Sequence, residues 1–261
     1  MMNFIKDHQF SGRKVVARFD FNVPLKDGEI LDTTRIDLSL ETIKFLLDEG
    51  ASKVVMISHL GRPKGKVNKD LSLEPVGKYI AEQLNEEVTL TQSAKDRGIK
   101  TMLSLPNSKL ILLENIRFHE EETKNDSDFA RQLASYGDCY VNDAFGTSHR
   151  AHASTHGIVS HFQQKNVFAG FLIEKEITAL NKVLESPEKP FIGVVGGAKV
   201  SDKIKIIERL LSSVDQLIIG GAMAYPFLKA KNISIGKSLC QDEDIALAKN
   251  ILNSKNAEKI I

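Results

Sequence analysis

Ten consecutive residues, 143–152, combine one carboxylate, one glycine, two histidines and one arginine in the order Asp-Ala-Phe-Gly-Thr-Ser-His-Arg-Ala-His. Buried Arg and Asp side chains cost free energy unless they are paired, so this composition is unfavourable for a core segment. It suits the binding of a small phosphorylated acid. Residues 58–63 and 115–119 contain two further clusters of arginine and histidine. Three such clusters predict one basic pocket that is assembled from several loops.

The arginines of these clusters each follow an apolar, β-branched segment of strand length. They are Arg62, Arg117 and Arg150, and His59 lies beside the first of them. A guanidinium can donate two parallel hydrogen bonds to one phosphate group. Because the carboxyl ends of parallel strands meet at one edge of a sheet, we expect these side chains to form a single ligand site.

Asp20 and Asn22 follow the first predicted strand, in the sequence Arg-Phe-Asp-Phe-Asn-Val-Pro. Residues two apart on an extended chain point to the same side, and Pro24 then ends strand pairing. A carboxylate and an amide placed together suit a vicinal hydroxyl group of a ligand at this sheet edge. The alternative is a local turn, in which both side chains accept hydrogen bonds from backbone N–H groups.

Arg35 lies in the first turn of a predicted helix, residues 34–48. A cation at this position opposes the helix dipole, whose N-terminal end is positive. The unfavourable placement indicates a ligand anion beside Arg35 and the helix N-terminus. The alternative is a solvated arginine.

Two glycine-containing turns follow predicted strands in the last third of the chain. In residues 193–203 a strand leads into glycines, then Lys199, then a predicted helix that contains Lys203. Two lysines four residues apart could both reach a polyphosphate from one helical face. The spacing matches neither G-x-x-x-x-G-K-[ST] nor G-x-G-x-x-G, and an ordinary tight turn is the alternative. The second turn, residues 218–224, could let a flat base approach the backbone.

Short β-branched segments alternate with segments of helical periodicity. Strands are expected at residues 14–19, 53–57, 109–113, 139–141, 191–195 and 216–219. Helices are expected at residues 34–48, 73–84, 126–136, 171–185 and 202–211. This alternation predicts an α/β fold of doubly wound parallel sheets, with helices on both faces.

The predicted helix at residues 171–185 is followed by Ser-Pro-Glu-Lys-Pro, which blocks its continuation. We expect an N-terminal lobe at residues 1–170, a hinge helix with a linker at 171–188, and a second lobe at 189–261. The second lobe contains two clear strands, whereas a sheet usually has about four to six. Its last residues, Ile260 and Ile261, look like the start of another strand. We therefore expect the second lobe to be incomplete.

The composition restricts the class of function. The formal net charge of +1 gives no overall basicity that would favour nucleic acid or an anionic membrane. No apolar run approaches ~20 residues, and the N-terminus has no signal-peptide core. Cys139 and Cys240 indicate neither a disulfide framework nor a metal site, which fits the reducing cytoplasm. His149 and His152 could bind zinc, but no cysteine or third ligand recurs at a suitable spacing.

Six segments in this order resemble the phosphoglycerate kinase family. They are residues 18–24, 58–63, 113–119, 142–152, 196–203 and 220–224, and the match covers essentially the whole chain. The resemblance implies two α/β lobes with a hinge, and reversible phosphoryl transfer between ATP and 3-phosphoglycerate with Mg²⁺. The products would be ADP and 1,3-bisphosphoglycerate. It also implies a cytoplasmic monomer.

The resemblance implies a role for each matched residue. The 3-phosphate would be bound by His59, Arg62, Arg117 and Arg150. The C2 hydroxyl would contact Asp20 and Asn22, and the carboxylate and migrating phosphoryl group would contact Arg35. Charge on that phosphoryl group would be neutralised by Lys199. The nucleotide would contact Gly197, Lys199, Lys203, Gly220, Gly221 and Ala222.

The chain also departs from the family pattern. Ala222 stands where many members have a glycine, and Pro226 where a threonine is common. The later nucleotide-lobe segments, including the aspartate that would hold magnesium, are not found, so we expect no metal ligand within this chain. A non-catalytic module that binds phosphoglycerate is therefore the alternative function. The chain lacks the fingerprint glycines of a dinucleotide-dependent oxidoreductase. It also lacks the interleaved aromatic residues of a nucleic-acid-binding protein.

Overall fold

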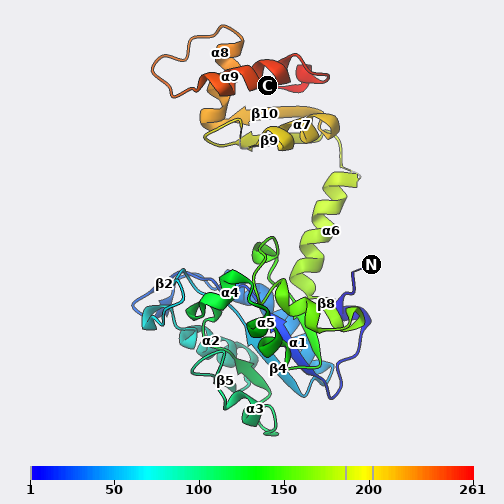
Figure 1. Cartoon of the computed structure of the whole chain (residues 1–261). Coiled ribbons are helices and arrows are strands. Elements are labelled where there is room, and N and C mark those ends of the chain that lie inside the picture. Colours follow the sequence, from blue (N-terminus) through cyan, green and yellow to red (C-terminus); the bar gives the residue numbers. More distant parts are fainter. Residues whose placement is uncertain (1, 186, 202) are drawn as a thin grey trace. The chain divides into compact units, whose positions relative to one another are not determined.

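The computed structural model describes residues 2–185, 187–201 and 203–261. The chain forms two compact units, Met1–Thr178 and Ala179–Ile261 (Figure 1). The division falls within helix α6, Phe171–Glu185, which matches the helix expected at residues 171–185. The three-part boundary at residues 170 and 188 stays a prediction.

The first unit contains a six-stranded sheet in the order β5-β6-β4-β1-β7-β8. All five neighbouring pairs are parallel. The strands are β1 Lys14–Arg18, β4 Lys53–Ile57, β5 Val88–Leu90, β6 Leu110–Leu112, β7 Cys139–Asn142 and β8 Val167–Ala169. β5 and β8 were not among the strands expected from the sequence.

Alternate residues of β1 pack on opposite faces of this sheet. Val15 and Ala17 belong to a core that includes the apolar faces of α1, Thr34–Asp48, and α2, Glu74–Leu84. Val16 belongs to a second core that includes α5, Ser127–Ala134. Helices therefore cover both faces, which confirms the doubly wound arrangement of this unit.

Shorter elements complete the first unit. Two strands, β2 Leu25–Lys26 and β3 Glu29–Ile30, form an antiparallel hairpin through Asp27 and Gly28, both at positive φ. The short helices are α3 Ile99–Met102 and α4 Glu120–Lys124. Single 3-10 turns lie at Ile5–Asp7, Lys69–Leu71, Ile116–Phe118, Phe145–Thr147, Gly157–His161 and Gln164–Asn166.

The second unit is built on two parallel strands, β9 Ile192–Gly196 and β10 Gln216–Gly220. Its helices are α7 Ile204–Ser213, α8 Ala224–Ala230 and α9 Asp242–Leu252, with 3-10 turns at Gly221–Met223 and Ala257–Lys259. Near the end of the described chain, Ile260 forms an isolated parallel bridge with Leu217.

One face of the β9–β10 sheet is buried and the other is exposed. Val195 and Leu217 lie in the core, whereas Val194 is 72% exposed and Ile192 is 47% exposed. Strands were expected at residues 191–195 and 216–219, and that expectation did not specify which of their faces would be buried. Apolar runs of this length do not distinguish a strand buried on one face from one buried on both.

Candidate functional site

The predicted site residues of the first unit lie after four neighbouring parallel strands. Asp20 and Asn22 follow β1, His59 and Arg62 follow β4, Arg117 follows β6, and Arg150 follows β7. These strands are adjacent in the order β6-β4-β1-β7. Their carboxyl ends therefore bring the side chains to one sheet edge, as the sequence predicted.

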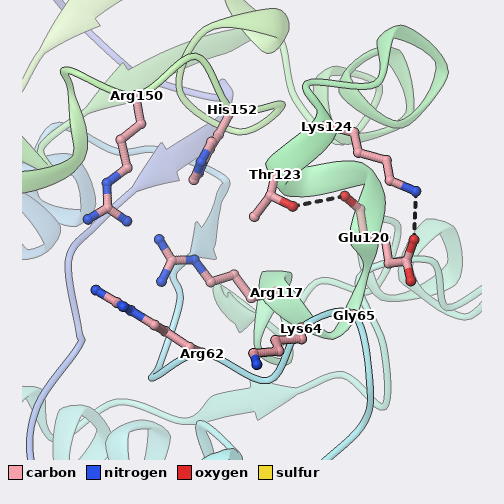
Figure 2. A pocket seen from close by; sticks show the side chains of 9 residues that line it. All are labelled: Arg62, Lys64, Gly65, Arg117, Glu120, Thr123, Lys124, Arg150 and His152. Atoms are coloured by element: carbon pink, nitrogen blue, oxygen red, sulfur yellow. Dashed lines mark hydrogen bonds and ion pairs between the residues drawn. The ribbon is translucent and has the colours of Figure 1, made fainter.

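Three arginines surround a cavity of about 580 Å³. Figure 2 shows the guanidinium groups of Arg62, Arg117 and Arg150 directed toward one another from three separate loops. The other lining residues are Lys64, Gly65, Glu120, Thr123, Lys124 and His152. The ammonium group of Lys124 is paired with Glu120 at 2.6 Å, so it contributes little net charge. The three guanidiniums and Lys64 make this cavity suitable for a multivalent oxyanion.

The loop that carries Arg62 is tied to Arg117. The N–H of Gly65 donates to the carbonyl of Arg117 at 3.1 Å, and Nη1 of Arg117 donates to the carbonyl of Gly61 at 2.9 Å. Gly65 has a φ of +76°, and a Cβ there would come within 2.1 Å of Glu120 Cγ. The positive φ therefore favours glycine at position 65, and a Cβ there would require the exposed Glu120 side chain to move.

The electrostatics of Arg117 indicate a site prepared for an anion. Its side chain is buried, and its Nε has no hydrogen-bond partner among the described residues. Burial, followed by repulsion from Arg150 and Arg18, lowers the pKa of Arg117 to about 10. The charge of Glu122 offsets this repulsion only in part, so the arrangement is unfavourable until an anion binds, and a bound phosphate would relieve that cost.

A second cavity, of about 330 Å³, adjoins the first through Arg150, which lines both. Its lining includes Asp20, Asn22, Arg35 and His59. Nη1 of Arg35 lies 2.7 Å from Oδ2 of Asp20. The ion pair with Asp20 therefore explains, within the chain, why Arg35 lies in the first turn of α1. A ligand anion is not needed to account for this position.

Other polar groups shape the second cavity. Oδ1 of Asn22 accepts a hydrogen bond from the N–H of Gly61 at 2.8 Å, so it also fixes the loop of Arg62. This bond joins residues 39 positions apart, so it is not the local turn that was the alternative for Asn22. Glu176, on α6, adds a carboxylate to the lining that the sequence analysis missed. Helical periodicity alone gave no signal that Glu176 faces a cavity.

A buried polar network lies behind the arginines. Oγ of Ser154 donates to Oε1 of Glu122 at 2.7 Å, and Nε of Arg18 donates to Oγ of Ser154 at 2.9 Å. Arg18 is 1% exposed and Glu122 is fully buried. The sequence analysis missed all three. A charged residue inside an apolar strand such as β1 was the available signal for Arg18.

Asp143, the first residue of the segment 143–152, lines neither of these two cavities. It is fully buried, and its Oδ1 accepts hydrogen bonds from the N–H groups of Leu172 at 2.9 Å and Ile173 at 3.2 Å. It therefore caps the N-terminus of α6, where a carboxylate is favoured. Gly170 makes this possible, because a Cβ there would lie 2.4 Å from the Asp143 carboxylate.

Asp143 is expected to make stability fall as the pH rises. Burial raises its pKa from 3.8 to about 6, so between these values the folded state holds a proton that the unfolded state has lost. The shift corresponds to about 3 kcal/mol, and the helix N-terminus offsets up to about 1 kcal/mol of it. We expect the stability of Asp143→Asn relative to wild type to increase by about 2 kcal/mol between about pH 4 and pH 7.5. Urea denaturation across this range tests it, and parallel curves for the two proteins would contradict it.

In the second unit, two glycine turns meet at the carboxyl ends of β9 and β10. The N–H of Met223 donates to the carbonyl of Gly197 at 3.0 Å. Gly221 has a φ of +67°, and a Cβ there would lie 3.1 Å from the Gly197 carbonyl oxygen. Gly220, Gly221 and Ala222 are therefore brought next to Gly197.

Lys199 and Lys203 do not share a helical face, so that expectation was wrong. Lys199 is exposed and lies in the loop after β9, and Lys203 is the residue before the first turn of α7. The helix was expected from residue 202, which lies outside the described residues. Glycine-rich turns delay the start of a helix, and spacing alone does not show by how much.

Within residues 2–185, 187–201 and 203–261, no group of three or more His, Cys, Asp or Glu side chains could hold a metal ion. None of the described helices is both long enough and apolar enough to cross a membrane.

A doubly wound parallel unit with an arginine-lined cavity at its carboxyl edge is typical of a protein that binds a phosphorylated ligand. The family model for phosphoglycerate kinase matches residues 5–261, and the chain belongs to this family.

Individual relatives agree with this assignment. The phosphoglycerate kinases of Bdellovibrio bacteriovorus and Moorella thermoacetica are 50% and 49% identical to the chain, over 95% of its length. The solved phosphoglycerate kinase of Coxiella burnetii is 38% identical, with a TM-score of 0.86, and the match covers 100% of this chain and 66% of that one. The chain spans 61% and 62% of the two curated relatives.

Proposed function

We propose that this chain supplies the phosphoglycerate-binding unit and part of the nucleotide-binding unit of a phosphoglycerate kinase. The enzyme would transfer a phosphoryl group reversibly between ATP and 3-phosphoglycerate, giving ADP and 1,3-bisphosphoglycerate. The observation that carries this proposal is the arginine-lined cavity, which shares Arg150 with a second cavity lined by Asp20, Asn22 and Arg35.

Each cavity suits one part of the substrate. The 3-phosphate would accept hydrogen bonds from Arg62, Arg117 and Arg150. The C2 hydroxyl would lie against Asp20 and Asn22, and the substrate carboxylate would approach Arg35. The nucleotide would contact Gly197, Lys203, Gly220, Gly221 and Ala222 in the second unit.

The chemistry needs no general base. A substrate carboxylate is already ionised at pH 7, since the pKa of a free carboxyl group is about 4. Catalysis then depends on positioning and on neutralising charge at the transferring group. We assign that neutralisation to Arg35 and Lys199. Because they belong to different units, the reaction would require the units to close on the substrates.

ATP would enter as its magnesium complex. The described residues offer no acidic cluster that fits the metal. We further propose a cytoplasmic monomer. The absence of a paired cysteine among the described residues is compatible with that compartment.

Calorimetric titration of the chain with 3-phosphoglycerate tests the proposed site. We expect saturable binding, and none with glycerate, which lacks the phosphate. A folded chain that binds neither compound, or both equally, would overturn the assignment of the arginine-lined cavity. We expect no ATP-dependent turnover by the chain itself, and a coupled assay checks this.

A further inference from the structure

The imidazole of His59 is held between two groups at one of its nitrogens. His59 follows β4, is 3% exposed and lines the second cavity. Its Nδ1 lies 3.2 Å from Nη2 of Arg18 and 3.7 Å from Oδ1 of Asp20. The first distance is that of a hydrogen bond, whereas the second is too long for one.

The partner at Nδ1 decides where the proton of the ring lies. A guanidinium has five N–H donors and no acceptor, so a hydrogen bond with Arg18 requires Nδ1 of His59 to accept. A neutral imidazole that accepts at Nδ1 carries its proton on Nε2. Nε2 of His59 has no partner among the described residues, and this leaves its N–H available to the cavity.

The alternative is a protonated His59 that forms an ion pair with Asp20. Four arginines oppose it. Burial, followed by repulsion from Arg18, Arg117, Arg150 and Arg35, lowers the pKa of His59 to about 2. The carboxylate of Asp20 is also already paired with Arg35 at 2.7 Å. The short contact with Arg18 and the positive charge of the surrounding arginines therefore both indicate a neutral imidazole at His59.

Arg18 is fixed where it makes this contact. Its Nε donates to Oγ of Ser154, its Nη1 to the carbonyl of Phe19, and its Nη2 reaches His59. Ser154 is held in turn by Glu122, and both are fully buried. Each end of the guanidinium is thus occupied, so Arg18 cannot turn away without leaving buried polar groups unpaired.

We propose that Arg18 is a positioning residue that fixes His59 in the neutral tautomer with the proton on Nε2. His59 then presents an uncharged N–H donor to the ligand, while the arginines supply the positive charge. The identity of that ligand rests on the proposed function, but the tautomer does not.

Nitrogen-15 spectroscopy of the histidine-labelled chain tests the tautomer without any ligand. The chain has seven histidines, and the His59→Gln variant identifies the His59 signals. We expect an unprotonated, pyridine-like Nδ1 and a protonated, pyrrole-like Nε2, unchanged between about pH 5 and pH 8. A protonated Nδ1, or a His59 that titrates in this range, would overturn the proposal.

Two variants test the role of Arg18. Arg18→Met removes the hydrogen bond that Nδ1 of His59 accepts, together with the nearest cation. We therefore expect the Nδ1 signal of His59 to shift toward a mixture of tautomers. Arg131→Met, at an arginine whose side chain is 65% exposed, is the matched control and should leave the signals of His59 unchanged. If Arg18→Met does not fold, Ser154→Ala keeps the guanidinium but removes the partner of its Nε, and should shift Nδ1 in the same direction. A folded variant with the unaltered His59 pattern would overturn the role of Arg18.

Addition of 3-phosphoglycerate separates this proposal from the proposed function. We expect the Nε2 resonance to shift on binding while Nδ1 stays unprotonated. Conversion of His59 to an imidazolium on binding would overturn the proposal even if the ligand binds. If calorimetry shows no binding, the proposed function fails, while the tautomer and the effect of Arg18→Met still stand on the ligand-free spectra.

Discussion

Replacement of Glu122 by alanine is expected to lower the free energy of unfolding by about 3–5 kcal/mol, because it leaves a buried charge without its partner. Glu122 is fully buried and accepts hydrogen bonds from the N–H and Oγ of Ser154 at 2.9 and 2.7 Å. Nδ1 of His152 lies 3.6 Å from Oε1 of the same carboxylate. Without this anion, Arg18 would lose its strongest carboxylate partner, and Asp20, the other carboxylate whose charge favours it, is already paired with Arg35.

The pH dependence of this loss has a definite sign. Burial alone would raise the pKa of Glu122, but the nearby His152 side chain, the charge of Arg18 and the hydrogen bonds from Ser154 together lower it. A carboxyl whose pKa is depressed by folding stabilises the protein above its unfolded value and loses that effect as the pH falls. The difference between wild type and Glu122→Ala should therefore be largest near neutral pH and shrink below about pH 4.

Urea denaturation at several pH values measures this difference. Glu120→Ala is the matched control, because Glu120 is on the same short helix and its side chain is 60% exposed. We expect this control to change stability by less than about 1 kcal/mol. A loss at Glu122 no larger than that of the control would mean that Arg18 finds another partner.

Most of the site could be predicted because the residues after parallel strands share one sheet edge. Arg62 and Arg117 are 55 positions apart in the sequence, and Arg117 and Arg150 are 33 apart. Each nevertheless follows a strand of the same sheet. Once the strands were identified, the common edge followed from the topology rather than from any contact.

The parts that could not be predicted depend on partners that are distant in sequence. Asp143 caps α6 through residues about thirty positions later, and Arg18 reaches Ser154 across 136 positions. A carboxylate within a basic loop has the same local pattern whether it contacts a ligand or a helix end. Only the packed structure distinguishes these two environments.

Arg117→Met is expected to weaken the binding of 3-phosphoglycerate by about 2–3 kcal/mol, which is roughly 30- to 150-fold in Kd. Arg117 is the buried arginine of the cluster, with an unpaired Nε that a phosphate oxygen could engage. Arg62 is exposed before ligand binds, so we expect a smaller loss for Arg62→Met. Hydrogen bonds to a phosphate are stronger where the donor is already removed from water.

The same substitution is expected to change the stability of the ligand-free chain by less than about 1 kcal/mol, because relief of a disfavoured charge offsets the loss of the hydrogen bond from Nη1 to the Gly61 carbonyl. A pKa of about 10 shows that burial and neighbouring arginines disfavour the charge of Arg117, and methionine fills similar space without that charge. Calorimetry with 3-phosphoglycerate and urea denaturation without it measure the two effects separately. Lys66→Met, on the exposed part of the Arg62 loop, controls for the loss of one positive charge. Weaker binding accompanied by an equal loss of stability would show that Arg117 supports the loop rather than the phosphate, whereas weaker binding alone assigns it to the ligand.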